Sequence, residues 1–182
     1  EYYWNSTKDL LIAFPVSGSG YDYQYRNLGE TENKGFEASV TWHAINKKNF
    51  GLDISANIGI NKNKVKSLGD MSQYSASSGW ASTAIQDDYI VRVGRPVGEI
   101  YGYISDGRYE VSDFTWDEAS QKWNLNAGVV NATDVVGASY MRPGAMKLKD
   151  LDGNGVVDEK DRTVIGDTNP DASGGFNISA RL

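Results

Sequence analysis

Residues 150–161 combine the residue types and the spacing of a calcium-binding loop. Counting Asp150 as position 1, oxygen-bearing side chains fall at positions 1, 3, 5, 9 and 12, and Gly155 occupies position 6. An EF-hand-type loop needs this pattern because alternate residues of a tight turn point at one centre and glycine permits the sharp bend. The predicted Ca²⁺ ligands are Asp150, Asp152, Asn154, Val156 (through its backbone carbonyl), Asp158 and Asp161.

Two features of this segment depart from an EF-hand. Position 12 is Asp161 rather than Glu, so bidentate ligation needs a closer approach. Residues 146–149 have an extended pattern where the incoming helix of an EF-hand would lie, which makes the segment more similar to a dockerin loop. The alternative is an acidic surface turn that its own Asx side chains stabilise. If calcium binds, we expect it to rigidify a loop and to take no part in catalysis.

No constellation of residues predicts an enzyme. The acidic pairs Asp87-Asp88 and Asp117-Glu118 are adjacent residues, which point to opposite faces of a strand and so form no two-carboxylate site. His43 is the only histidine and has no partner pattern for a metal or a catalytic triad. The chain contains no cysteine, which excludes thiolate sites and disulfides.

Aromatic residues make up 12% of the chain and are frequent in its irregular segments. Their flat faces can stack on sugars or hold peptides, and they can equally pack the small cores that shape a long loop. The candidates for ligand contact are Tyr21, Tyr23, Tyr25, Trp80, Tyr101, Tyr103, Tyr109, Trp116 and Trp123. The net charge of −6, with no basic run, argues against a nucleic-acid partner.

The clearest periodicity predicts a β-hairpin. Apolar and polar residues alternate over 35–43 and again over 52–61, with a short polar turn at 44–50. Strands of about 9–11 residues with one apolar and one polar face are typical of a tilted outer-membrane strand. A soluble sandwich hairpin has the same pattern, and the two differ in whether lipid or a second sheet covers the apolar face. Trp42 would belong to an interfacial belt in the first case and to a buried core in the second.

The predicted organisation alternates strands with loops of unequal length. Residues 1–61 should hold barrel strands and hairpins with one extracellular loop at 17–33, residues 62–174 a long extracellular loop region, and 175–182 the start of another strand. Within the long region we expect short strands at 88–93, 100–105 and 122–125, and no helix longer than two turns. Both ends look cut, so we expect an internal piece of a longer chain.

Three motifs in this order resemble those of SusC/RagA-type, TonB-dependent outer-membrane transporters. They are Asn27-Leu28-Gly29-Glu30 followed by 33–37, Val93-Gly94-Arg95-Pro96-Val97-Gly98-Glu99-Ile100-Tyr101-Gly102-Tyr103, and the stretch from Pro143-Gly144 through 149–155 and 161–166 to Asn169-Pro170. The resemblance implies a large barrel with an N-terminal plug, energised through the TonB complex. It also implies a SusD-like surface lipoprotein that captures glycans or peptides, and the outer membrane of a Bacteroidetes-like Gram-negative bacterium.

The expected fold is therefore all-β: a partial transmembrane antiparallel β-barrel, built from strand hairpins in contact with outer-membrane lipid, with a long structured extracellular loop. The expected function is that of a fragment of an importer for glycans or peptides, not an enzyme. The alternative is a secreted, soluble, calcium-stabilised β-module that binds carbohydrate or protein. The plug and the segment that contacts TonB are not in this sequence.

Overall fold

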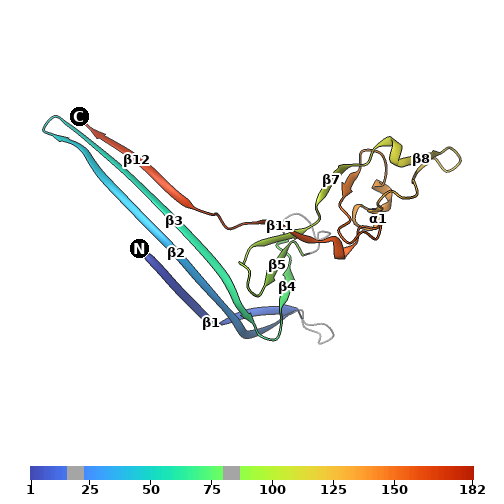
Figure 1. Ribbon diagram of the computed structural model, residues 1–182, viewed down its shortest axis with the longest axis horizontal. Coiled ribbons are helices and arrows are strands. Elements are labelled where there is room, and N and C mark those ends of the chain that lie inside the picture. Colours follow the sequence, from blue (N-terminus) through green and yellow to red (C-terminus); the bar gives the residue numbers. More distant parts are fainter. Residues whose placement is uncertain (16–22, 80–86) are drawn as a thin grey trace. The chain divides into compact units, whose positions relative to one another are not determined.

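The structure is a computed structural model that describes residues 1–15, 23–79 and 87–182. These residues form an all-β fold in two compact units, one of residues 1–99 with 167–182 and the other of residues 100–166. Each unit has its own buried cluster, so each is described by itself. Figure 1 labels many of the elements along the chain.

The first unit is built on four long antiparallel strands. They are β1 (Tyr2–Pro15), β2 (Tyr23–Lys47), β3 (Phe50–Leu68) and β12 (Ser173–Arg181), and they lie side by side in the order β1-β2-β3-β12 (Figure 1). The β2–β3 connection is a turn of only two residues, Lys48 and Asn49. The predicted hairpin and the predicted final strand are thus confirmed.

The strands are longer than the sequence pattern predicts. Residues 23–33 belong to β2, so the loop expected at 17–33 is wrong over that range, and residues 16–22 lie outside the described part of the chain. Residues 62–68 continue β3 instead of opening the long loop, and β12 begins at Ser173. The reason is that backbone pairing continues after the outward side chains become polar. Hydrophobic alternation therefore marks only the apolar part of a longer ladder.

The register aligns side chains of one kind across neighbouring strands. Cα partners on one face are Phe36 with Ile60, Ala38 with Ile58, Val40 with Ala56, Trp42 with Ile54, and, from β12, Phe176 with Ala56 and Ile178 with Ile54. Partners on the other face are Glu37 with Gly59, Ser39 with Asn57, Thr41 with Ser55 and His43 with Asp53. We call the first set the apolar face. Most of its large side chains are exposed, with Val40 at 65% and Trp42 at 62%.

Beyond this sheet, the first unit closes on a small apolar cluster. Val65 and Leu68 at the end of β3 pack with Val91 of β5 (Tyr89–Arg92), which pairs with β4 (Gln73–Ala76). The chain after β5 is held to β3 by two backbone hydrogen bonds, from Val65 N–H to the Arg95 carbonyl (2.9 Å) and from Gly94 N–H to the Val65 carbonyl (2.8 Å). The long connection therefore starts from an ordered base.

A buried carboxylate fixes the same segment. Glu99 is only 1% exposed and accepts hydrogen bonds from Arg92 (2.7 Å and 2.9 Å) and from Arg95 (2.7 Å). Both guanidinium groups reach solvent, so the three side chains form an ion cluster with a buried carboxylate and partly exposed cations. This arrangement gives the motif at 93–103 a structural role at its start.

The second unit is a series of short elements around an aromatic core. Its elements are β6 (Glu99–Gly102, whose first residue belongs to the first unit), β7 (Ser105–Arg108), η1 (Val111–Asp113), β8 (Phe114–Asp117), β9 (Lys122–Leu125), α1 (Thr133–Val136), η2 (Ala138–Tyr140), β10 (Met146–Leu148), η3 (Glu159–Asp161) and β11 (Thr163–Asp167, ending in the first unit). The core contains Tyr109, Phe114, Ala132, Leu148 and Val157. None of the helices in the described ranges is long and apolar enough to span a membrane.

We expect Glu99→Gln to loosen the segment that follows β5. The change removes the charge that holds Arg92 and Arg95 and should cost about 1–2 kcal/mol locally, since both arginines are partly screened by water. Amide hydrogen exchange of Val65 and Gly94 in the full-length protein should rise roughly tenfold. Glu118→Gln, in an exposed turn, serves as the control. Unchanged exchange at Gly94 in the Glu99 variant would contradict this role.

Candidate functional site

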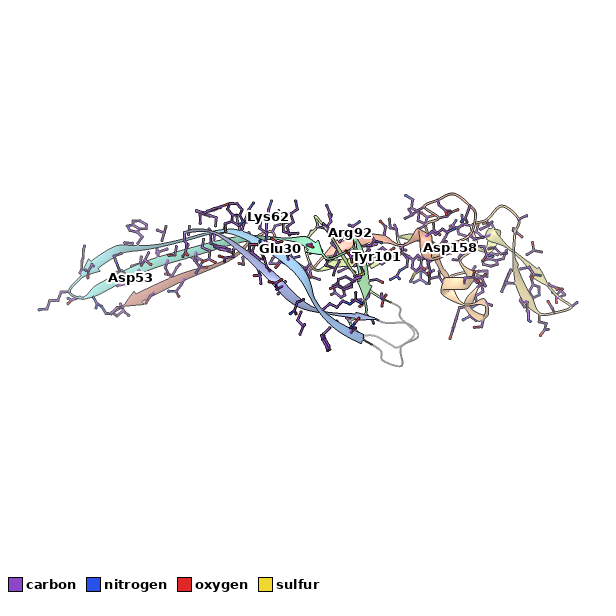
Figure 2. All side chains as sticks on the ribbon, turned by 90° about the horizontal axis from the view of Figure 1, so that it is seen from below. Glu30, Asp53, Lys62, Arg92, Tyr101 and Asp158 are labelled. Atoms are coloured by element: carbon purple, nitrogen blue, oxygen red, sulfur yellow. The ribbon has the colours of Figure 1, made fainter. Side chains whose placement is uncertain are left out.

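The loop at 150–161 brings three of its predicted ligands together. One carboxylate oxygen each from Asp150, Asp152 and Asp161 lies within 4.8 Å of the other two. The loop runs between β10 and η3, so a short strand and a single helical turn hold its two ends. In Figure 2, Asp158 marks this part of the second unit.

Asp150 shapes the first half of the loop through backbone hydrogen bonds. Its two carboxylate oxygens accept from Gly153 N–H and Gly155 N–H, each at 2.7 Å. Both glycines have positive φ, 76° and 87°, in the region that side chains with a Cβ rarely adopt. The glycine at position 6 is thus required by the backbone, as the motif predicts. A carboxylate that accepts two hydrogen bonds retains lone pairs for a cation.

Asp161 closes the loop from a solvent-inaccessible position. Its carboxylate accepts backbone N–H bonds from Leu151 (2.7 Å), Asp158 (2.8 Å) and Asp152 (3.4 Å), which join the two halves of the loop. The N–H groups of Asp158 and Leu151 hold the pKa of Asp161 below its usual range, against the opposing effect of burial. Asp161 is therefore an anion that the loop itself stabilises.

The remaining predicted ligands make hydrogen bonds of their own, and Asn154 Nδ2 donates to Asp152 Oδ2 (3.1 Å). Asn154 Oδ1 accepts from Val156 N–H (2.7 Å), and Asp158 caps η3 by accepting from Lys160 N–H (2.7 Å). The backbone around Val156 pairs with Asn131. The Asn131 N–H donates to the Gly155 carbonyl, and the Val157 N–H donates to the Asn131 carbonyl. Hydrogen bonds thus account for the shape of the loop, and the three clustered carboxylates supply the hard oxygen donors that calcium prefers.

The loop aromatics of the second unit mostly pack against one another. Tyr109 is 1% exposed, donates to the Val130 carbonyl (2.6 Å) and lies edge-on to Phe114, so it is a core residue. Trp116 and Trp123 form a pair on the β8–β9 hairpin with ring centroids 5.1 Å apart. Burial raises the pKa of the Tyr109 hydroxyl, which keeps it a neutral hydrogen-bond donor.

The other aromatic candidates differ in their surroundings. Tyr101 and Tyr103 lie under the Arg162 guanidinium, 4.5 Å and 6.0 Å from their ring centroids. Tyr25 is exposed on β2, whereas Tyr23 begins that strand. Tyr21 and Trp80 lie outside the described residues. Contacts with neighbouring side chains therefore account for the position of each candidate aromatic residue in the second unit.

Asp117, from one of the acidic pairs, and His43 make local contacts within a turn and between two strands. Asp117 accepts from the Ser120 hydroxyl (2.6 Å) and Ala119 N–H (3.0 Å) in the β8–β9 turn, and these bonds lower its pKa. His43 Nδ1 lies 2.6 Å from Asp53 Oδ1 on the polar face, with both side chains exposed. In the ranges that the structure covers, no serine hydroxyl bonds to the His43 ring, so these contacts form no triad.

A group of lysines on the long sheet was missed by the sequence analysis. Lys34 pairs with Lys62, and Lys64 pairs with Glu32, in the two rows that follow the apolar face. The alternation of Lys62, Lys64 and Lys66 with Asn63 and Val65 in the sequence is itself a strand signal. It was overlooked because the strand was expected to end at residue 61.

The whole chain matches known outer-membrane proteins. Residues 1–182 match the sequence profile described as "TonB dependent receptor-like, beta-barrel". TonB-dependent receptor P3 of Formosa agariphila is 32% identical over 182 residues, which are 100% of this chain and 17% of that relative. TonB-dependent receptor SusC of Bacteroides thetaiotaomicron is 38% identical over 82 residues, 42% of this chain and 8% of SusC.

The fold matches a solved transporter as well. The structure of the RagAB peptide importer in its closed-closed state aligns with a TM-score of 0.65 at 21% identity, covering 98% of this chain and 17% of that chain. Its open-open state aligns with a TM-score of 0.61. The fold is thus a partial antiparallel β-barrel with a long structured insertion, and the chain spans about a sixth of the length of these proteins.

We expect the loop at 150–161 to loosen in acid through Asp161. Because its folded pKa is lowered, the stabilisation is complete above the ordinary aspartate value of about 3.9 and is lost as pH falls through the lower folded value. Hydrogen-exchange protection of the Leu151 and Asp158 amides should fall over that window. Asp161→Asn should lower this protection at neutral pH, and Asp134→Asn, an exposed acid in α1, should leave it unchanged.

Proposed function

The chain belongs to the TonB-dependent receptor-like β-barrel family, and we propose that it forms part of the barrel wall and one long extracellular loop of an outer-membrane importer. The single observation that carries this proposal is the exposed apolar face of the four-stranded sheet. Its aliphatic and aromatic side chains line up across β2, β3 and β12, and they remain exposed along the strands. A face of this composition fits lipid.

The lengths of the connections support an orientation in the membrane. The β2–β3 turn has two residues, whereas β3 and β12 are joined by residues 69–172. Outer-membrane barrels have short periplasmic turns and longer extracellular loops. We therefore assign the turn at Lys48 and Asn49 to the periplasmic side and the second unit to the extracellular side.

The substrate and the partners follow from the resemblance of the sequence motifs and from the relatives. SusC is named a TonB-dependent receptor and RagAB a peptide importer. We propose that the parent protein imports glycans or peptides with a SusD-like surface lipoprotein and draws energy from the TonB complex through a plug. These residues would contribute wall and loop, without a catalytic group.

The barrel proposal predicts that Arg is tolerated on the polar face of β3 but not on its apolar face. Ile58→Arg would place a cation in lipid and should cost roughly 2–4 kcal/mol, while Asn57→Arg on the polar face should cost little. The measurement is the amount of folded full-length protein in the outer membrane, scored by heat-modifiable electrophoretic mobility. Equal yields of the two variants would favour the alternative of a secreted β-module.

A second proposal concerns the acidic loop of the second unit. We propose that Ca²⁺ binds at Asp150, Asp152 and Asp161, supported by the convergence of their carboxylate oxygens within 4.8 Å. Calcium would rigidify a loop whose halves are already joined by Asp161. Asn154, Asp158 and the Val156 carbonyl complete the set that the motif predicts.

Terbium luminescence of the purified full-length protein tests the calcium proposal. Signal that calcium displaces should be present in the wild type and in Asp134→Asn, and it should weaken at least about tenfold in Asp152→Asn, which removes one charged ligand. Absence of displaceable signal at millimolar calcium would leave the loop as a turn stabilised by its own side chains. This result would not affect the barrel assignment, which the Ile58 and Asn57 variants test separately.

A further inference from the structure

The outward surface of the sheet changes from apolar to basic where the apolar face ends. The row Phe36–Ile60 is followed by Lys34–Lys62, with Trp4 of β1 opposite Lys34. The next row on the same side pairs Glu32 with Lys64. Lys66 lies at the adjoining bulge, with its Nζ 4.0 Å from Glu32 Oε2. We call Lys34, Lys62, Lys64 and Lys66 the basic cluster.

The basic cluster has more cations than its neighbours neutralise. Glu32 is shared by Lys34 at 3.0 Å and Lys66 at 4.0 Å. Lys62 and Lys64 are exposed and have no acidic partner within 4.0 Å in the described part of the chain. A local excess of positive charge in a chain of net charge −6 favours an anionic partner.

Trp4 stands beside the cluster in the geometry of a membrane-interface residue. Its indole Nε1 donates to Glu32 (3.0 Å), Lys34 Nζ lies 4.6 Å from its ring centroid, and the residue is 64% exposed. Tryptophan concentrates at the level of lipid headgroups, where one part of the ring is in apolar surroundings and the N–H is hydrogen-bonded. Trp4 therefore marks the level of the cluster as the interface.

The length of the apolar face also places the basic cluster near the membrane interface. From Leu52 to Ile60 is eight residue steps along β3, roughly 26 Å at about 3.3 Å per residue. At the tilt of about 35–45° of barrel strands, this segment spans roughly 19–22 Å of the membrane, which is most of the apolar band of about 25 Å. Lys62 follows directly on β3, farther along the strand from the tight turn than Asp53 (Figure 2).

We propose that the basic cluster binds the phosphate groups of an anionic glycolipid in the outer leaflet of the membrane. The inference rests on the proposed function for its orientation, which places this end of the sheet on the extracellular side. Lysines on a lipid-facing surface at the level of the headgroups can form ion pairs with lipid phosphates. Because Lys62 and Lys64 lie two residues apart on one strand face, one diphosphorylated headgroup can engage both.

The test is native mass spectrometry of the detergent-purified, full-length protein incubated with lipid A, a diphosphorylated glycolipid. Wild type should retain bound lipid A, and Lys62→Gln with Lys64→Gln should weaken retention at least about tenfold, since each lysine contributes at a charged surface. The matched control removes the same charges at the other end of the sheet, with Lys47→Gln and Lys48→Gln. The control should retain lipid A as wild type does.

Further arms separate the alternatives. Replacement of Lys62 and Lys64 by Arg should preserve retention, which keeps the test informative if the Gln variant folds poorly. Equal retention by the Gln variant and the control, or equal retention of zwitterionic phosphatidylcholine, would overturn the proposal. Competition by inorganic phosphate at millimolar concentration would assign the site to free phosphate. Heat-modifiable mobility and outer-membrane location, scored on the same variants, report the barrel separately from the lipid site.

Discussion

The rest of the structure depends on the pairing of backbone N–H and C=O groups along four long strands. A strand that crosses lipid has no water to satisfy these groups, so each must bond to a neighbouring strand. β2 and β3 meet this requirement with a ladder that runs from Lys47–Phe50 to Gly29–Leu68. Pairing over this length fixes the register, and the register in turn decides which side chains form the apolar face. A slip by one residue would exchange Ile58 for Asn57 on that face.

The same ladder anchors the described residues at the start of the long connection. β3 extends past its apolar part and ends in Val65 and Leu68, which pack with Val91 from the hairpin after them. Glu99 and its two arginines then hold the chain as it leaves. The second unit does not rely on lipid, because Tyr109 and its neighbours give it a core of its own. The end of the long sheet and the second unit are thus each stabilised by a separate apolar cluster.

The sequence predicts the apolar part of the fold well and the polar part poorly. Alternation over 35–43 and 52–61 identifies the hairpin because one face is uniformly apolar there. The same strands continue through 23–33 and 62–68, where polar and charged residues interrupt the apolar face and the pattern gives little contrast. Backbone pairing is what continues, and side-chain hydropathy does not report it. The short strand at 122–125 was predicted because Trp and Leu alternate with polar residues there.

The candidate calcium loop illustrates a different limit of sequence reasoning. Spacing alone predicts six ligands around one centre, and in the structure three of the carboxylates gather while Asn154 and Asp158 also accept backbone N–H bonds. Carboxylates and amides in such a loop can bond to N–H groups or to a cation, and the two uses require the same residue types. Asp150 and Asp161 already join the loop through five N–H bonds, so an ion would add to a shape that exists without it. Calcium would then act on the stiffness of the loop more than on its path, which is a structural role.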